Sequence, residues 1–88
     1  MEASVYLARI HIKLKESILD PQGQAVLHAL HNLEHSAVRD VRIGKYVEVR
    51  LDETEEEQAR QQVESYCATL LANPVIETYE FQLERESP

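Results

Sequence analysis

The sequence is short of the residues that stabilise a small protein covalently or through a metal ion. Its 88 residues include one cysteine, so no internal disulfide can form, and no CxxC pair is present for a structural zinc ion. A chain of this length buries only about 60–65% of its unfolded surface, which leaves an isolated domain marginally stable. We therefore expect the chain to gain stability by associating with other subunits.

Basic residues and long apolar runs are also scarce. Nine Lys and Arg residues face sixteen Asp and Glu, a formal net charge of −7, which disfavours nucleic acid and anionic membranes as partners. No apolar run approaches the roughly 20 residues of a membrane span, and the first four residues lack the basic and apolar features of a signal peptide. Together with the lone free cysteine, these features predict a cytoplasmic protein with no nucleic-acid or membrane partner.

The first half of the chain predicts a strand followed by a helix. Apolar residues alternate over residues 6–14, while the other face carries Arg9, His11 and Lys13 but also Leu7. This period of two is typical of a half-buried strand. Asp20 can cap a helix whose first residue is Pro21, and an apolar stripe predicts that this helix covers residues 21–34.

The segment at residues 38–51 has an alternation that constrains its pairing. A two-residue hairpin at Gly44 and Lys45 would set Val41 opposite Glu48, an apolar residue against a charged one, which burial disfavours. The pattern fits one long strand bent at Gly44, which we favour, or a three-residue loop that preserves the alternation.

The second half predicts another helix and a last strand. Thr54 and Glu57 form the sequence of a capping box, Asn73 and Pro74 form a helix stop, and residues 75–83 read as a strand. The expected fold is α+β, in the order β-α-β-α-β or β-α-β-β-α-β, with two helices packed on one face of a mainly antiparallel sheet. We expect one domain over residues 1–84 and a frayed tail at 85–88.

The side chains that could carry chemistry have simpler roles. His28, His31 and His35 share one helix face, which fits a solvated or interface surface better than a metal site. Cys67 lies on the apolar stripe of the second helix and is expected to be buried. Gly44 and Lys45 lack the rest of a P-loop. The residues therefore predict no catalytic set, no cofactor and no metal, so that the pattern alone leads to an α+β domain that oligomerises.

Three segments resemble the PurS family. Residues 14–26 (LKESILDPQGQAV) resemble its strand-to-helix turn, residues 40–48 (DVRIGKYVE) its central strand, and residues 71–79 (LANPVIETY) its helix-to-strand ending. They occur in the order and at the spacing of the family, and the likeness spans roughly residues 4 to 84.

The resemblance implies a non-catalytic subunit of phosphoribosylformylglycinamidine (FGAM) synthase, an ATP-dependent ligase of purine biosynthesis. That assembly converts formylglycinamide ribonucleotide, ATP and glutamine into the amidine, ADP, phosphate and glutamate. The family member helps to hold the ATP-dependent synthetase subunit to the glutaminase subunit, so that ammonia reaches the second site. The resemblance also implies a homodimer or a homotetramer.

Matching the family motifs residue by residue places the expected assembly contacts in the three segments. They are Asp20, Pro21, Gln22, Gly23, Arg42, Gly44, Lys45, Asn73 and Pro74. Most of these also have a structural reason, as helix start, bend or helix stop, whereas Arg42 and Lys45 suggest a docking point for a carboxylate or a phosphate. The rival hypotheses are a small ligand-binding regulatory module and a metal-binding protein that uses the histidine face.

Overall fold

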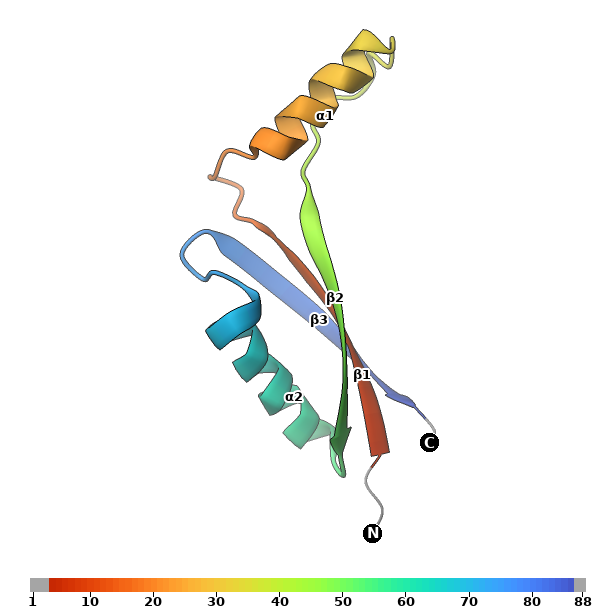
Figure 1. The fold of residues 1–88 in the computed structure, drawn as a ribbon, viewed down its shortest axis with the longest axis vertical. Coiled ribbons are helices and arrows are strands. Elements are labelled where there is room, and N and C mark those ends of the chain that lie inside the picture. Colours follow the sequence, from red (N-terminus) through yellow and green to blue (C-terminus); the bar gives the residue numbers. More distant parts are fainter. Residues whose placement is uncertain (1–3, 87–88) are drawn as a thin grey trace.

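A computed structural model describes residues 4–86 as a three-stranded sheet with two helices (Figure 1). The elements follow in the order β1 (Ser4–Leu14), α1 (Pro21–Asn32), β2 (Gly44–Glu53), α2 (Glu56–Tyr66), a π-helical turn (Cys67–Leu71) and β3 (Glu77–Glu86). This confirms the α+β class and the order β-α-β-α-β, and within the described residues it excludes the alternative with a fourth strand.

The sheet has the strand order β2-β1-β3, and both pairings are antiparallel. In the register, Ile10 lies opposite Val47 on one side and Phe81 on the other. β1 is central because it is the most apolar strand, and both of its edges are hydrogen-bonded. The free edges therefore belong to β2 and β3, whose exposed faces carry more polar residues.

One face of the sheet packs against α2 and forms the core. Ile10, Ala59, Val63 and Cys67 have no exposed surface. Cys67 is thus buried as predicted, and burial raises the pKa of its thiol, with the charge of Glu64 acting in the same direction. A thiol held neutral in an apolar core contributes packing and not nucleophilic chemistry.

The expectation that both helices cover one face of the sheet is wrong for α1. Only α2 lies along the sheet, whereas α1 projects beyond the end of the strands (Figure 1). Within residues 4–86, α1 contributes no residue to the core, and Val26 and Leu33 on its apolar stripe are 39% and 68% exposed. The helix is amphipathic, as the sequence predicts, but in the described part of the chain its apolar side does not join the core.

The expectation of one long strand bent at Gly44 is also wrong. β2 begins at Gly44, and residues 38–43 have no regular secondary structure. The physical reason is the length of the neighbouring strand: Lys13 pairs with Gly44, and β1 ends one residue later. Residues 38–43 have no strand beside them, and the N–H of Ile43 is bound by a side chain instead of a sheet ladder.

Two smaller expectations also differ from the structure. The N-cap of α2 is Glu55 without a side-chain cap bond, because Thr54 instead hydrogen-bonds the carboxylate of Glu53. β3 runs to Glu86, so Arg85 and Glu86 pair with β1, although both belong to the tail that was expected to fray. The rest of that tail, residues 87–88, lies outside the described residues.

Candidate functional site

The three loops that carry the family-like segments meet at one end of the sheet, which we call the loop end. It is where β1 ends at Leu14, β2 begins at Gly44 and β3 begins at Glu77. The backbone N–H of Lys15 donates to the carbonyl of Ile76 over 2.9 Å, which ties the first loop to the last. Segments about 60 residues apart in the chain are thus held together at the loop end.

Asp20 is the centre of the loop end. Its side chain is only 3% exposed, and its two carboxylate oxygens accept hydrogen bonds from different segments. Oδ1 accepts from the N–H of Gly23 over 3.0 Å, as expected of an N-cap, and Oδ2 accepts from the N–H of Ile43 over 2.6 Å. One carboxylate therefore starts α1 and also fixes the entry to β2.

The electrostatics of Asp20 follow from these contacts. The hydrogen bonds from Ile43 and Gly23 hold the pKa of the carboxyl below its ordinary value, and the charge of Arg42 acts in the same direction. Burial opposes them, but it is outweighed. The carboxylate is therefore ionised at neutral pH, when both of its acceptor oxygens are needed.

The residue types after Asp20 are determined both by helix geometry and by the little room available beside residues 41–43. Pro21 occupies the first helical position, where the missing N–H would have no partner. A Cβ on Gly23 would overlap the carbonyl oxygen of Val41 and lie 2.8 Å from Oδ2 of Asp20. Gly23 is thus required by the close approach of residues 41–43. Gln22 is exposed on the same turn.

Arg42 has a structural role that the sequence did not indicate. Its Nη2 atom donates to the carbonyls of Lys15 and Ile18, each over 2.9 Å. The guanidinium therefore fastens the loop between β1 and α1, and only part of its donor capacity remains for another molecule. The expected docking of a partner at Arg42 depends on the remaining N–H groups.

Lys45 connects the start of β2 to the loop before β3. Its Nζ atom lies 3.6 Å from Oε2 of Glu77 and 3.5 Å from the carbonyl of Leu71. Oε1 of Glu77 accepts the N–H of Asn73 over 2.7 Å. Glu77 thus links two predicted site residues, yet it was missed, because a single acidic residue at the start of a strand carries no motif.

The Asn73–Pro74 loop is shaped by its own hydrogen bonds. Oδ1 of Asn73 accepts the N–H of Val75 over 3.1 Å, a turn that Asn side chains commonly stabilise. The helix that it was expected to stop ends at Leu71 as a π-helical turn. Pro74 is exposed.

Large apolar side chains are exposed in the π-helical turn and in the loops that lead to the loop end. Leu70 is 81% exposed, Val75 75% and Leu19 69%. Exposed apolar side chains with basic and polar neighbours are typical of a surface that another protein covers. The loop end therefore has the composition of a binding surface.

The three histidines of α1 and the loop after it, His28, His31 and His35, do not converge on a common site. Nε2 of His31 lies 2.8 Å from the carbonyl of Val38, which ties the end of α1 to the following loop, while His28 and His35 are exposed. Across residues 4–86, no cluster of three His, Cys, Asp or Glu side chains is arranged to hold a metal ion. In the same part of the chain, no helix is long and apolar enough to cross a membrane.

The fold and this site define a class: a small α+β protein in which, over residues 4–86, one helix does not pack on the sheet and three turns gather at one end of the sheet. A family model described as PurS, phosphoribosylformylglycinamidine (FGAM) synthase, matches residues 7–85. The chain belongs to the PurS family, the family of a subunit of FGAM synthase in purine biosynthesis.

Individual relatives are similar over nearly the whole chain. The PurS subunit of Bacillus subtilis is 45% identical over 80 residues, which cover 91% of this chain and 94% of that one. A crystal structure of Methanocaldococcus jannaschii PurS matches with a TM-score of 0.83 at 38% identity, covering 93% and 99% of the two chains. A chain in the structure of PurLQS from Thermotoga maritima matches with a TM-score of 0.82 at 26% identity, covering 93% and 98%.

We predict that Asp20→Asn destabilises the chain at neutral pH and that the difference from wild type shrinks in acid. An amide oxygen accepts one of the two N–H groups, but the amide nitrogen cannot accept the other. Because the folded pKa of Asp20 is lowered, its contribution is fully present above the unfolded value of about 3.9 and is lost as the pH falls through the lower folded value. Urea unfolding at several pH values measures both effects.

Asp52→Asn, an exposed change on β2, is the control and is expected to leave the neutral-pH midpoint nearly unchanged. A difference between Asp20→Asn and wild type that stays constant from neutral to acid pH would contradict the assigned role of the carboxylate.

Proposed function

We propose that this chain is the non-catalytic assembly subunit of an FGAM synthase. In this proposal it joins an ATP-dependent synthetase subunit to a glutaminase subunit. The enzyme converts formylglycinamide ribonucleotide, ATP, glutamine and water into FGAM, ADP, phosphate and glutamate. The observation that carries the proposal is the loop end, where three distant segments form an exposed surface with apolar and basic side chains. The match to a chain in the Thermotoga maritima PurLQS structure supports it.

In this proposal the chain holds the partner subunits in position and takes no part in the bond-breaking chemistry. The partner subunits bind ATP and glutamine, and ammonia released from glutamine passes between them while the assembly keeps them apposed. The chain itself needs no cofactor or metal for this role. The proposed location is the cytoplasm, where the nucleotide substrates of such a ligase are found.

We further propose that α1 packs against a second copy of this chain, within a homodimer or a homotetramer. A compact chain of this length has a radius of gyration of about 12 Å, whereas this one measures 17.2 Å and extends over 57 Å. A 12-residue helix is marginally stable in water unless something covers its apolar face. A second copy supplies the same apolar stripe, so that two identical surfaces can cover each other.

We predict that Leu33→Asp shifts the purified chain toward a smaller assembly, because it places a charge on the apolar stripe of α1. Leu70→Asp is a matched control, since Leu70 is at least as exposed but lies in the π-helical turn. Sedimentation velocity gives the masses. If Leu33→Asp keeps the wild-type mass, α1 is not the contact between copies.

We predict that Lys45→Glu weakens assembly with the synthetase and glutaminase subunits by about ten-fold or more, the scale of removing a charge at an interface and adding one of opposite sign. Arg50→Glu is the matched control. Both residues lie on β2, both side chains are 57% exposed, and both pair with a glutamate of β3. Only Lys45 lies at the loop end.

Titration of the labelled chain into the two partner subunits, followed by light scattering of the complex, measures the two affinities. Equal affinities for Lys45→Glu and wild type would remove the loop end from the contact. Equal losses for both charge reversals would indicate a general charge effect and would also contradict the proposal.

A further inference from the structure

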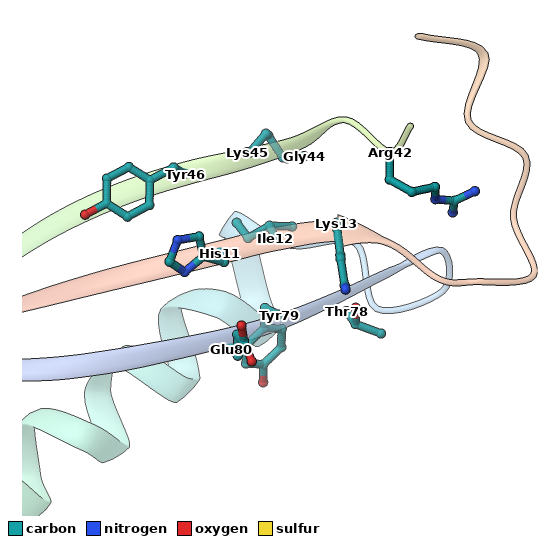
Figure 2. Close-up of a pocket in the computed structure, with 10 residues that line it drawn as sticks. All are labelled: His11, Ile12, Lys13, Arg42, Gly44, Lys45, Tyr46, Thr78, Tyr79 and Glu80. Atoms are coloured by element: carbon teal, nitrogen blue, oxygen red, sulfur yellow. The ribbon is translucent and has the colours of Figure 1, made fainter. Parts of the chain in front are cut away.

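A hollow of about 590 Å³ opens on the face of the sheet that α2 leaves uncovered, next to the loop end (Figure 2). Pockets that hold small molecules commonly measure about 300–1,000 Å³. The face is set by the alternation of β1, because Ile10 and Ile12 point into the core, and His11 and Lys13 therefore point to the other side. The hollow shares Arg42, Gly44 and Lys45 with the loop end, and its other lining residues lie on β1, β2 and β3.

Two neighbouring rows of cross-strand partners make the floor of the hollow. In the first row, His11 lies between Tyr46 on β2 and Glu80 on β3. In the second row, two residues further along, Lys13 lies between Gly44 and Thr78. Each row thus crosses all three strands, and the two rows place different chemistry side by side.

The first row supplies a ring surface. The ring centroids of His11 and Tyr46 lie 5.0 Å apart, and the two ring planes meet at an angle of 38°. The hydroxyl of Tyr46 donates to Oε2 of Glu48 over 2.9 Å, which holds the ring in place, yet Tyr46 remains 50% exposed. A planar base can stack on such a platform. Glu80, at the other end of the row, offers carboxylate oxygens to hydroxyl donors.

The second row supplies a free cation. On this face Arg9 pairs with Glu84 and Arg50 pairs with Glu86. Lys13, by contrast, has no ion pair among residues 4–86, although Glu80 lies on the adjacent strand. Figure 2 shows its side chain reaching across toward Thr78 on β3. Arg42 lines the mouth of the hollow and keeps unused N–H donors.

Gly44 keeps the second row open on the side of β2. A Cβ at this position would lie 2.7 Å from the carbonyl oxygen of Ile12 and 3.4 Å from Cβ of Lys13. Glycine is therefore required by the close approach of β1. Lys13, Gly44 and Thr78 all line the hollow, so a group the size of a phosphate can approach the Lys13 ammonium from the hollow's open side.

We propose that this hollow binds a ribonucleoside 5′-phosphate. The base stacks on Tyr46 and His11, the ribose hydroxyls donate to Glu80, and the phosphate lies against Lys13 at the end nearest Arg42. Carboxylates commonly accept ribose hydroxyls in nucleotide sites, and lysine binds phosphate as a point charge. This binding is a property of the chain itself and does not depend on its proposed role in FGAM synthase.

The test is a titration of the purified, ¹⁵N-labelled chain with four probes: AMP, ribose 5-phosphate, adenosine and inorganic phosphate. We expect saturable AMP binding with a Kd below about 1 mM, with shifts of the Lys13, Gly44 and Thr78 amide signals. Ribose 5-phosphate is expected to bind more weakly than AMP because it lacks the base, and inorganic phosphate more weakly again because it lacks both the base and the ribose. Adenosine is expected to lose the shifts at Gly44 and Lys13.

Three variants assign the contacts. Lys13→Gln is expected to weaken AMP binding about ten-fold, Lys13→Arg to retain most of it, and Tyr46→Leu to weaken it about ten-fold while leaving phosphate binding unchanged. Arg50→Gln, on the same face but outside the hollow, is the control and is expected to change affinity less than two-fold, roughly the effect of a distant screened charge. Amide spectra without ligand verify that each variant is folded.

Several results would overturn the proposal. Absence of saturable AMP binding by the folded wild-type chain rejects it directly. Equal affinities for AMP and inorganic phosphate reject the ring and ribose contacts. An equal loss in Arg50→Gln and Lys13→Gln rejects the hollow as the location. None of these results bears on whether the chain joins the synthetase to the glutaminase.

Discussion

The structure depends most on one buried carboxylate. Asp20 accepts the N–H of Gly23 and the N–H of Ile43, and these two bonds decide where α1 begins and where the chain re-enters the sheet. The first bond alone would be an ordinary helix cap. The second joins segments 23 residues apart, so that the direction of α1 is coupled to the position of β2. The contact of Arg42 with the same loop reinforces this coupling.

The rest of the molecule divides into a packed part and a part that is left open. α2 and one face of the sheet form the core, while α1 lies beyond the strands and the opposite sheet face is uncovered (Figure 1). A chain with so small a core is expected to use its open surfaces for association. This arrangement suits a subunit that acts by holding other subunits, because most of its surface remains available for contacts.

The sequence predicted those features that depend on local rules. The alternation in β1, the cap at Asp20 with Pro21, and the apolar stripe of α2 around Cys67 each follow from the residues themselves, and each is found in the structure. The family segments also led to the correct family. These signals were readable because each occupies a short stretch of chain with its own periodicity or capping chemistry.

The features that were missed depend on contacts between distant segments. The alternation at Val41 and Ile43 suggested that the strand continues before Gly44, but among the described residues no neighbouring strand reaches that far. The apolar stripe of α1 suggested that the helix packs on the sheet. That expectation failed because a sequence does not state which chain covers an apolar face. The link from Glu77 to Lys45 and Asn73 joins three loops and leaves no pattern in any of them.

The proposed role of this chain is to assemble an FGAM synthase. The most direct measurement is the rate of FGAM formation by the synthetase and glutaminase subunits, with and without this chain, using either glutamine or free ammonia as the nitrogen source. The account predicts that glutamine supports the reaction only when the chain is present, and that ammonia supports it with much less dependence on the chain. Equal glutamine-dependent rates with and without the chain would contradict the account.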